Sequence, residues 1–254
     1  MRRLWLLVVL AGCGRFGFGS SDKPDSAIGD APRDGPADAP TLTCLPSYSV
    51  CDGFEGPSID SSTWMVDPMI AIDTTRAHRG ASSLHVHAQA FAAGQGSYTS
   101  LFETKTLVSG ATTFWVRGWF WLSALPAPGN GMELITAERP GSAGDYVFVF
   151  SNRTSVYSQF DLSSQEAMVA VPAASWFCVV FKIVRSTTAS GALEASGDIP
   201  PLALTGVITD AAQPMTQVTL GMGFASSNVL TAQPALDLWI DDVIVHTSPL
   251  TCSD

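Results

Sequence analysis

The sequence predicts an all-β fold, a two-layer antiparallel β-sandwich. Two observations carry this prediction. From Cys51 onward, segments rich in Val, Phe, Trp and Thr alternate with turns of Gly, Pro, Ser and Asn, and no stretch keeps a helical apolar period for three turns. About a dozen short strands of this kind suit two sheets packed face to face, as in a sandwich or jelly roll.

The composition agrees with one folded domain that buries a substantial core. Apolar residues make up 46% of the 254 residues and charged residues 14%. The net charge is −10, and no cluster of Lys and Arg follows Arg3. Because nucleic-acid binding needs cations that neutralise phosphates, the sequence argues against a nucleic-acid partner.

Residues 1–12 have the pattern of an export signal. Met1-Arg2-Arg3 precedes an apolar run, residues 4–10, that is too short to span a bilayer. The run Leu10-Ala11-Gly12-Cys13 resembles the lipobox of bacterial lipoproteins, which implies cleavage before Cys13 and acylation of this residue. Gly14 stands where an Asp would favour the inner membrane, so the resemblance implies lipid anchoring at the outer membrane or cell surface. The alternative is an ordinary secretory signal with an incidental cysteine.

Residues 13–43 have the composition of a disordered tether, with Gly, Ser, Asp, Ala and Pro in irregular order. We expect them to hold one folded domain, residues 44–254, at some distance from the membrane. Beyond Cys13, an even number of cysteines in an exported chain predicts two disulfides. Sequence alone allows three pairings, of which we favour Cys44 with Cys51 and Cys178 with Cys252.

Eight segments show the clearest strand pattern. In chain order they are residues 83–91, 98–103, 112–122, 132–137, 145–150, 176–185, 216–224 and 236–246. The last segment carries two adjacent carboxylates, Asp241 and Asp242, one on each face of an otherwise apolar strand. A buried carboxylate needs a partner.

The segment 112–122 supplies the candidate ligand surface. Alternation places Phe114, Val116, Phe120 and Leu122 toward the core, and Trp115, Arg117, Trp119 and Trp121 on the opposite side. Sugar rings pack well on indoles, and an arginine binds hydroxyls or a carboxylate, so this side is a candidate glycan platform. The alternative is that loops cover it, which would make the tryptophans a second core.

Several motifs in order resemble a known class of sandwich. They are Asp52-Gly-Phe-Glu-Gly56, Trp64, Arg79-Gly-Ala-Ser-Ser-Leu84, Phe114-Trp-Val-Arg117, Trp176-Phe-Cys178 and Leu238-Trp-Ile-Asp-Asp-Val243. Together they look like a concanavalin-like or laminin-G-like jelly roll, the fold of lectins, carbohydrate-binding modules and some polysaccharide-degrading enzymes. The opening and closing motifs also resemble calcium-containing carbohydrate-binding modules. We therefore expect a structural calcium ion held by Glu55 and Asp242. The alternative is that Asp241 and Asp242 form a solvated bulge or accept backbone hydrogen bonds.

Three functions stay open: a non-catalytic glycan-binding or adhesive surface module, a carbohydrate-active enzyme, and a structural surface protein. Glycosidases resembling laminarinases carry Glu-x-Asp-x-x-Glu, which is missing here. Glu133 and Glu138 lie five positions apart, so in a regular strand they face opposite ways unless a bulge intervenes. With Asp145 they are the acids that a hydrolase would use. A polysaccharide lyase would need a His or Tyr base, but His85 and His87 read as polar residues of an exposed strand face.

Overall fold

The computed structural model describes residues 40–103, 111–138, 143–210 and 216–253. The expected signal peptide, Cys13 and most of the tether lie outside these residues. Residues Arg33–Asp254 belong to one compact unit. The described part contains no helix long and apolar enough to cross a membrane.

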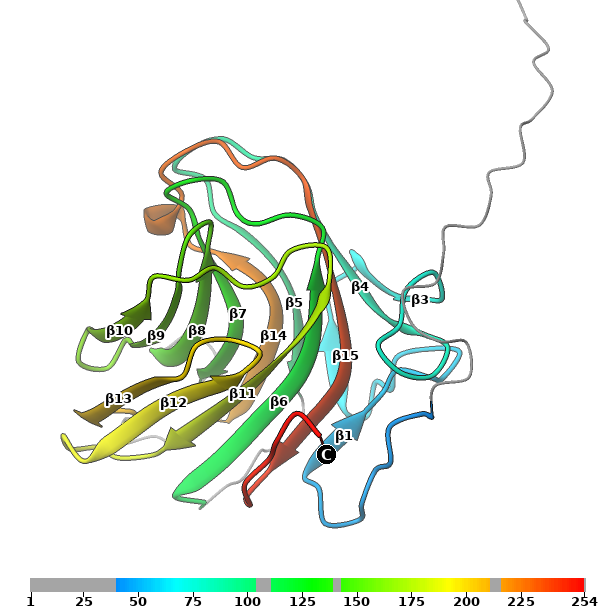
Figure 1. Cartoon of the computed structure of the whole chain (residues 1–254), viewed down its shortest axis with the longest axis horizontal. Coiled ribbons are helices and arrows are strands. Elements are labelled where there is room, and N and C mark those ends of the chain that lie inside the picture. Colours follow the sequence, from blue (N-terminus) through cyan, green and yellow to red (C-terminus); the bar gives the residue numbers. More distant parts are fainter. Residues whose placement is uncertain (1–39, 104–110, 139–142, 211–215, 254) are drawn as a thin grey trace, which may run out of the picture. The chain divides into compact units, whose positions relative to one another are not determined.

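The described chain folds into two antiparallel sheets (Figure 1). The first sheet runs in the order β13 (Leu202–Val207), β12 (Gly191–Gly197), β11 (Trp176–Val184), β6 (Thr113–Leu122), β15 (Leu236–His246), β4 (Ser83–Ala88) and β3 (Ile70–Asp73), and β1 (Val50–Asp52) also pairs with β15. The second sheet runs β10 (Ser163–Ala167), β9 (Thr154–Ser158), β8 (Gly144–Phe150), β7 (Gly131–Glu138), β14 (Gln217–Phe224), β5 (Ser97–Glu103) and β2 (Trp64–Val66). The helical element in the described part is a single 3-10 turn, η1 (Ser226–Asn228). The predicted all-β sandwich is confirmed.

The core lies between the sheets, on the faces that alternation predicts. Phe114, Val116 and Phe120 of β6 are buried in it, and Phe177 and Val179 of the neighbouring β11 join them. Because residues i and i+2 of a strand share a face, the intervening side chains of both strands point away from the core. The outer faces of the two sheets are therefore where a ligand site must be sought.

Strand β15 changes its partner where the two carboxylates stand. Its first part pairs with β4 up to Ile240, and its last part pairs with β1 from Val243 onward. The register against β6 shifts between Asp241 and Ile244, and Asp242 has a positive φ of 49°. This bulge buries both carboxylates, so they do not simply alternate between the two faces.

Both favoured disulfides are confirmed. Cys44 pairs with Cys51 across 7 positions, and Cys178 pairs with Cys252 across 74 positions. The first closes a loop at the start of the domain, where Cys51 belongs to β1. The second fastens the C-terminal segment to β11, next to the centre of the first sheet.

Candidate functional site

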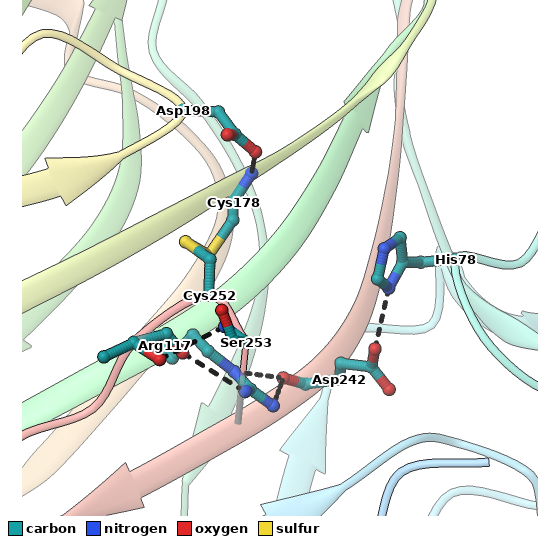
Figure 2. The surroundings of a disulfide bond; sticks show 8 residues. His78, Arg117, Cys178, Asp198, Asp242, Cys252 and Ser253 are labelled. Atoms are coloured by element: carbon teal, nitrogen blue, oxygen red, sulfur yellow. Dashed lines mark hydrogen bonds and ion pairs between the residues drawn. A yellow bond between two sulfur atoms is a disulfide. The ribbon is translucent and has the colours of Figure 1, made fainter. Parts of the chain in front are cut away.

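The tryptophan side of β6 is covered by the two ends of the domain. Trp115 and Trp119 are half-buried in a small apolar group on the outer face of the first sheet, here called the outer cluster. Its members are Leu42, Tyr48, Cys51, Trp115, Trp119, Cys178, Val180, Ile244, Leu250 and Cys252. The Cys178–Cys252 disulfide holds the C-terminal segment at this face (Figure 2).

Arg117 has a structural role at the same face. Its side chain is fully buried, and its Nη2 donates to the backbone oxygen of Asp242 at 3.2 Å. Its Nη1 donates to the backbone oxygen of Thr251 at 3.4 Å. The guanidinium thus ties the bulge of β15 to the C-terminal segment (Figure 2).

The remaining aromatic side chains of this face pack on one another. His78 stacks on Trp119 with ring centroids 3.6 Å apart. The guanidinium carbon of Arg76 lies 3.5 Å from the centre of the Trp121 ring, and Trp239 meets that ring edge-on at 5.0 Å. Arg117 and Trp121 are buried. The expectation of an open platform is therefore corrected for these two residues, and the covered alternative describes this face better.

A groove lies on the other sheet, on the face that turns away from the core. Its volume is about 620 Å³. It crosses β7, β8, β9 and β10, which lie side by side (Figure 1). Residues of the loop around η1 also line it. The lining includes Tyr98, Glu133, Glu138, Tyr146, Phe148, Phe150, Arg153, Ser155, Tyr157, Gln159, Ser164, Glu166 and Leu230.

Alternation along β8 builds the aromatic floor. Val147 and Val149 point into the core, so Tyr146, Phe148 and Phe150 point into the groove. On β9, Tyr157 stands directly opposite Tyr146, with ring centroids 5.9 Å apart. At the rim, Tyr98 of β5 is 57% exposed, so its ring is free to meet a ligand. Three of the four tyrosines of the chain therefore line this groove.

A pair of β-bulges brings two carboxylates to the same face. The register between β7 and β8 shifts between Glu133 and Ile135, and the register of β7 against β14 shifts in the same region. Because a bulge adds one residue, Glu133 and Glu138 both reach the groove despite their odd spacing. Gly223 of β14 is paired with Glu133 of β7, and a Cβ atom on Gly223 would lie 2.8 Å from Glu133 Oε2.

The groove has a negative electrostatic character. Burial and the charge of Glu138 raise the pKa of Glu133 to about 7. Burial, together with the charges of Glu133 and Glu138, also raises the pKa of Tyr98. Glu138 Oε1 accepts hydrogen bonds from Gln217 Nε2 at 3.2 Å and from Thr219 Oγ1 at 3.1 Å. A proton-holding acid thus lies near a hydrogen-bonded acceptor.

Arg153, in the turn between β8 and β9, is the cation among the described lining residues. Its Nε lies 3.1 Å from Glu166 Oε1, and its guanidinium carbon lies 3.8 Å from the centre of the Phe150 ring. The charge is therefore matched by a carboxylate of the groove itself. Asp145, the third acid considered for a hydrolase, faces away from the groove and is fully buried. It is removed from the candidate catalytic set.

The sequence pointed to Glu133 and Glu138 as candidate acids, but not to the groove or to its aromatic floor. The signal was present as the aromatic alternation Tyr146, Phe148, Phe150, opposite the apolar Val147 and Val149. The alternating tryptophans of β6 were a more conspicuous signal of a ligand surface than the aromatic residues of β8. No pattern on a single strand shows which of two outer faces the chain termini cover.

Glu55 and Asp242, the expected calcium ligands, reach the same loop. Both oxygens of Glu55 accept from the backbone N–H of Ala81 at 3.0 Å. Asp242 Oδ2 lies 2.7 Å from His78 Nδ1 and 3.5 Å from Arg79 Nε (Figure 2 shows the histidine contact). Asp242 Oδ1 is buried without a hydrogen-bond partner, which is an arrangement that fits a bound cation. No described group of three or more His, Cys, Asp or Glu side chains is placed to hold a metal ion, so backbone or hydroxyl oxygens would have to complete the site.

The protein is a jelly-roll β-sandwich with a groove on the outer face of its second sheet. No protein-family model and no curated protein matches the chain. Among solved structures it is similar to the cellulose-induced protein Cip1, with a TM-score of 0.59 and 18% identity over 80% of this chain and 99% of that one.

Two further structures share the fold. The endo-β-1,4-glucuronan lyase of the fungus Trichoderma reesei has a TM-score of 0.54 and 16% identity over 82% of this chain and 94% of that one. The alginate lyase Aly36B has a TM-score of 0.54 and 10% identity over 80% and 98%. At these identities the likeness shows the fold.

Proposed function

We propose that this protein is a glycan-binding module whose site is the groove over β7 to β10. The aromatic floor of the groove carries the proposal. Tyr146, Phe148 and Tyr157 form one row across two strands, and Tyr98 stands exposed at the rim. The volume of about 620 Å³ suits a short stretch of a sugar chain.

The chemistry of the lining supports a carbohydrate ligand. Sugar rings present C–H faces that pack on aromatic rings, and their hydroxyls need hydrogen-bonding partners. Gln159 and Ser164 are exposed and polar at the groove, beside the aromatic floor. Two proteins that share the fold are lyases of polysaccharides by name, which agrees with a glycan ligand.

The proposal is tested by retention on glycans. The unit Arg33–Asp254 is applied to a glycan array and to native gels that contain polysaccharide, beside the variants Tyr98→Ala and Tyr157→Ala. Both variants should lose retention by at least tenfold, and Tyr98→Ala should keep its melting midpoint because that ring is exposed. Tyr48→Ala is the matched control, because Tyr48 belongs to the outer cluster of the other sheet. Retention that survives both groove variants would exclude this site.

A second candidate function is glycoside hydrolysis at the same groove. It is favoured by the bulge that places Glu133 and Glu138 on one face, where one holds a proton near pH 7. The test is release of reducing sugar from each retained glycan. Hydrolysis requires that Glu133→Gln abolish release while retention stays; retention without release assigns a binding module.

A further inference from the structure

We propose that the groove accepts uncharged glycan chains and rejects polyuronates. This inference rests on the proposed function and names the class of ligand for the same site. It is carried by the balance of charges that face the groove. Three carboxylates line it, from Glu133, Glu138 and Glu166, against the single guanidinium of Arg153 among the described residues.

The guanidinium is already engaged by the protein. Arg153 Nε lies 3.1 Å from Glu166 Oε1, and the group is stacked on Phe150. A uronate carboxylate that approached the guanidinium would lie beside the negative charge of Glu166, which already offsets the charge of Arg153. Glu133 and Glu138 would face the sugar chain directly. Among the described side chains of the lining, no cation lies between these two carboxylates and the ligand. Like charges at close range disfavour binding, and a partly buried site screens them weakly.

The residues of the groove also argue against cleavage of polyuronates by a lyase mechanism. A lyase acts on a uronate by neutralising its carboxylate and removing a proton with a base. The four histidines of the chain all lie outside the groove lining. Tyr146 donates its hydroxyl hydrogen to Gln159 Oε1 at 2.7 Å, and burial and the neighbouring carboxylates raise its pKa, so the hydroxyl stays protonated and is not available as a base. The lining of this groove therefore does not suit a polyuronate, the class of polymer that the two lyases of the same fold act on by name.

The test compares two classes of polymer under one set of conditions. Affinity electrophoresis of the unit Arg33–Asp254 is run at pH 8 with uncharged polymers, namely hydroxyethyl cellulose, laminarin, galactomannan and galactan. It is also run with the polyuronates alginate, polygalacturonate and glucuronan. At least one uncharged polymer should retard the protein. The concentration that it requires should be at least tenfold lower than the concentration of any polyuronate that gives the same retardation. Added salt should narrow this difference, because it screens the repulsion.

Charge variants separate the groove from the acidity of the whole protein. Glu133→Gln should strengthen retention by polyuronates several-fold relative to the parent protein. Glu194→Gln makes the same change of charge on β12 of the other sheet, where Glu194 pairs with Lys182, and it should not. Melting midpoints of both variants establish that they are folded.

The outcomes distinguish the two proposals. If a polyuronate retards the protein as strongly as any uncharged polymer, and Tyr98→Ala abolishes that retention, the groove remains the glycan site and the inference about charge is overturned. Equal gains from Glu133→Gln and Glu194→Gln overturn it as well, because they assign the selectivity to overall charge. If no polymer of either class is retained, or if retention is indifferent to Tyr98→Ala, the proposed function fails and this inference with it.

Discussion

Asp145 is a fully buried carboxyl group on β8 that has no hydrogen-bond partner for either oxygen. Ser158 stands opposite it, but its hydroxyl donates to the backbone oxygen of Ile208 at 2.6 Å. Burial, which the nearby Ser158 hydroxyl opposes, and the charges of Asp210 and Asp161 raise the pKa of Asp145 from 3.8 to about 8. The folded protein therefore keeps this proton at neutral pH, where the unfolded chain has lost it.

This residue predicts a pH dependence with a definite sign. Between about pH 4 and pH 8 the unfolded chain binds fewer protons at Asp145, so the free energy of unfolding falls as the pH rises through this window. Asp145→Asn removes that fall. We expect a gain of at least about 1 kcal/mol at pH 7, or roughly 2–4 °C in melting midpoint, which vanishes below about pH 4.

Asp237→Asn is the control of opposite sign. Burial acts to raise the pKa of Asp237, but hydrogen bonds from His87 and His85 prevail and lower it. That variant should lose stability at neutral pH and approach the parent protein as the carboxylate becomes protonated in acid. Melting curves from about pH 2 to pH 8 cover both transitions, because the lowered pKa of Asp237 places its protonation below about pH 4. A loss of stability in Asp145→Asn that is the same at every pH would contradict this account of Asp145.

Trp119 tests whether the outer face of the first sheet is a second core. Its ring stacks on His78 and packs in the outer cluster. Trp119→Ala should cost about 3 kcal/mol of unfolding free energy, measured in urea, because removing a large packed ring leaves a cavity. Glycan retention should stay as in the parent protein. A variant of parental stability that no longer binds would restore the tryptophan platform.

At the scale of elements, the β-bulges determine which face of a strand the carboxylates occupy, and the sequence alone does not reveal them. The five-position spacing of Glu133 and Glu138 predicts opposite faces for a regular strand, and the bulge in β7 places both at the groove. The bulge of β15 likewise buries Asp241 and Asp242 where the strand changes partner from β4 to β1. A bulge depends on pairing with neighbouring strands, so the single-strand pattern does not reveal it.

The bulge of β15 is also where a calcium ion is expected. Asp242 Oδ1 is buried without a partner, and Glu55 contacts the same loop as Asp242. We propose that calcium raises the melting midpoint by several degrees and that a chelator reverses this, because an ion bound by the folded state stabilises it. Asp242→Asn should remove the response. An unchanged midpoint, with no calcium found by elemental analysis, would argue that His78 and Arg79 are the sole partners of this carboxylate.

The two disulfides should differ in their contributions. The Cys178–Cys252 bond closes a loop of 74 positions and the Cys44–Cys51 bond one of 7. Loop-closure entropy predicts a loss of about 4 kcal/mol for the first and about 2 kcal/mol for the second when both cysteines are replaced by Ala. Urea unfolding of the two double variants measures the difference. A larger loss of unfolding free energy without the Cys44–Cys51 bond would show that local contacts around that bond outweigh chain entropy.

At the scale of the molecule, the sequence predicted the sandwich because its central strands are long and alternate clearly. The segment 236–246 matches β15, and the segment 176–185 differs from β11 by one residue. The strands outside the eight clearest segments are short or polar, such as β10 with the sequence SSQEA, and are defined by pairing with a neighbour.

The candidate site was harder to predict because it depends on long-range packing. The groove is assembled from β5, β7, β8, β9 and β10, each of which contributes one to three side chains. The tryptophan side of β6 looks like a binding surface until the segments around Tyr48 and Leu250 cover it. Those contacts link residues that are far apart in the sequence.

The N-terminal anchor remains a proposal at this scale, since Cys13 lies outside the described residues. We propose that the chain is a lipoprotein of the outer membrane or cell surface. Cys13→Ser should abolish incorporation of labelled palmitate and release the protein from the membrane fraction. Ser20→Ala, a change beyond the lipobox, is the control and should label normally. Continued labelling of Cys13→Ser would contradict the anchor.

The most direct test of the glycan groove is a titration of the ¹⁵N-labelled unit Arg33–Asp254 with an oligosaccharide from a retained polymer, followed by NMR. The tryptophans of the described residues all lie outside the groove lining, so their indole N–H signals separate the two faces of the molecule. The account predicts that backbone amide signals of β8 and β9 shift with increasing sugar while the indole signals of Trp115, Trp119 and Trp121 stay in place. Shifts of those indole signals, with the amides of β8 and β9 unmoved, would contradict it.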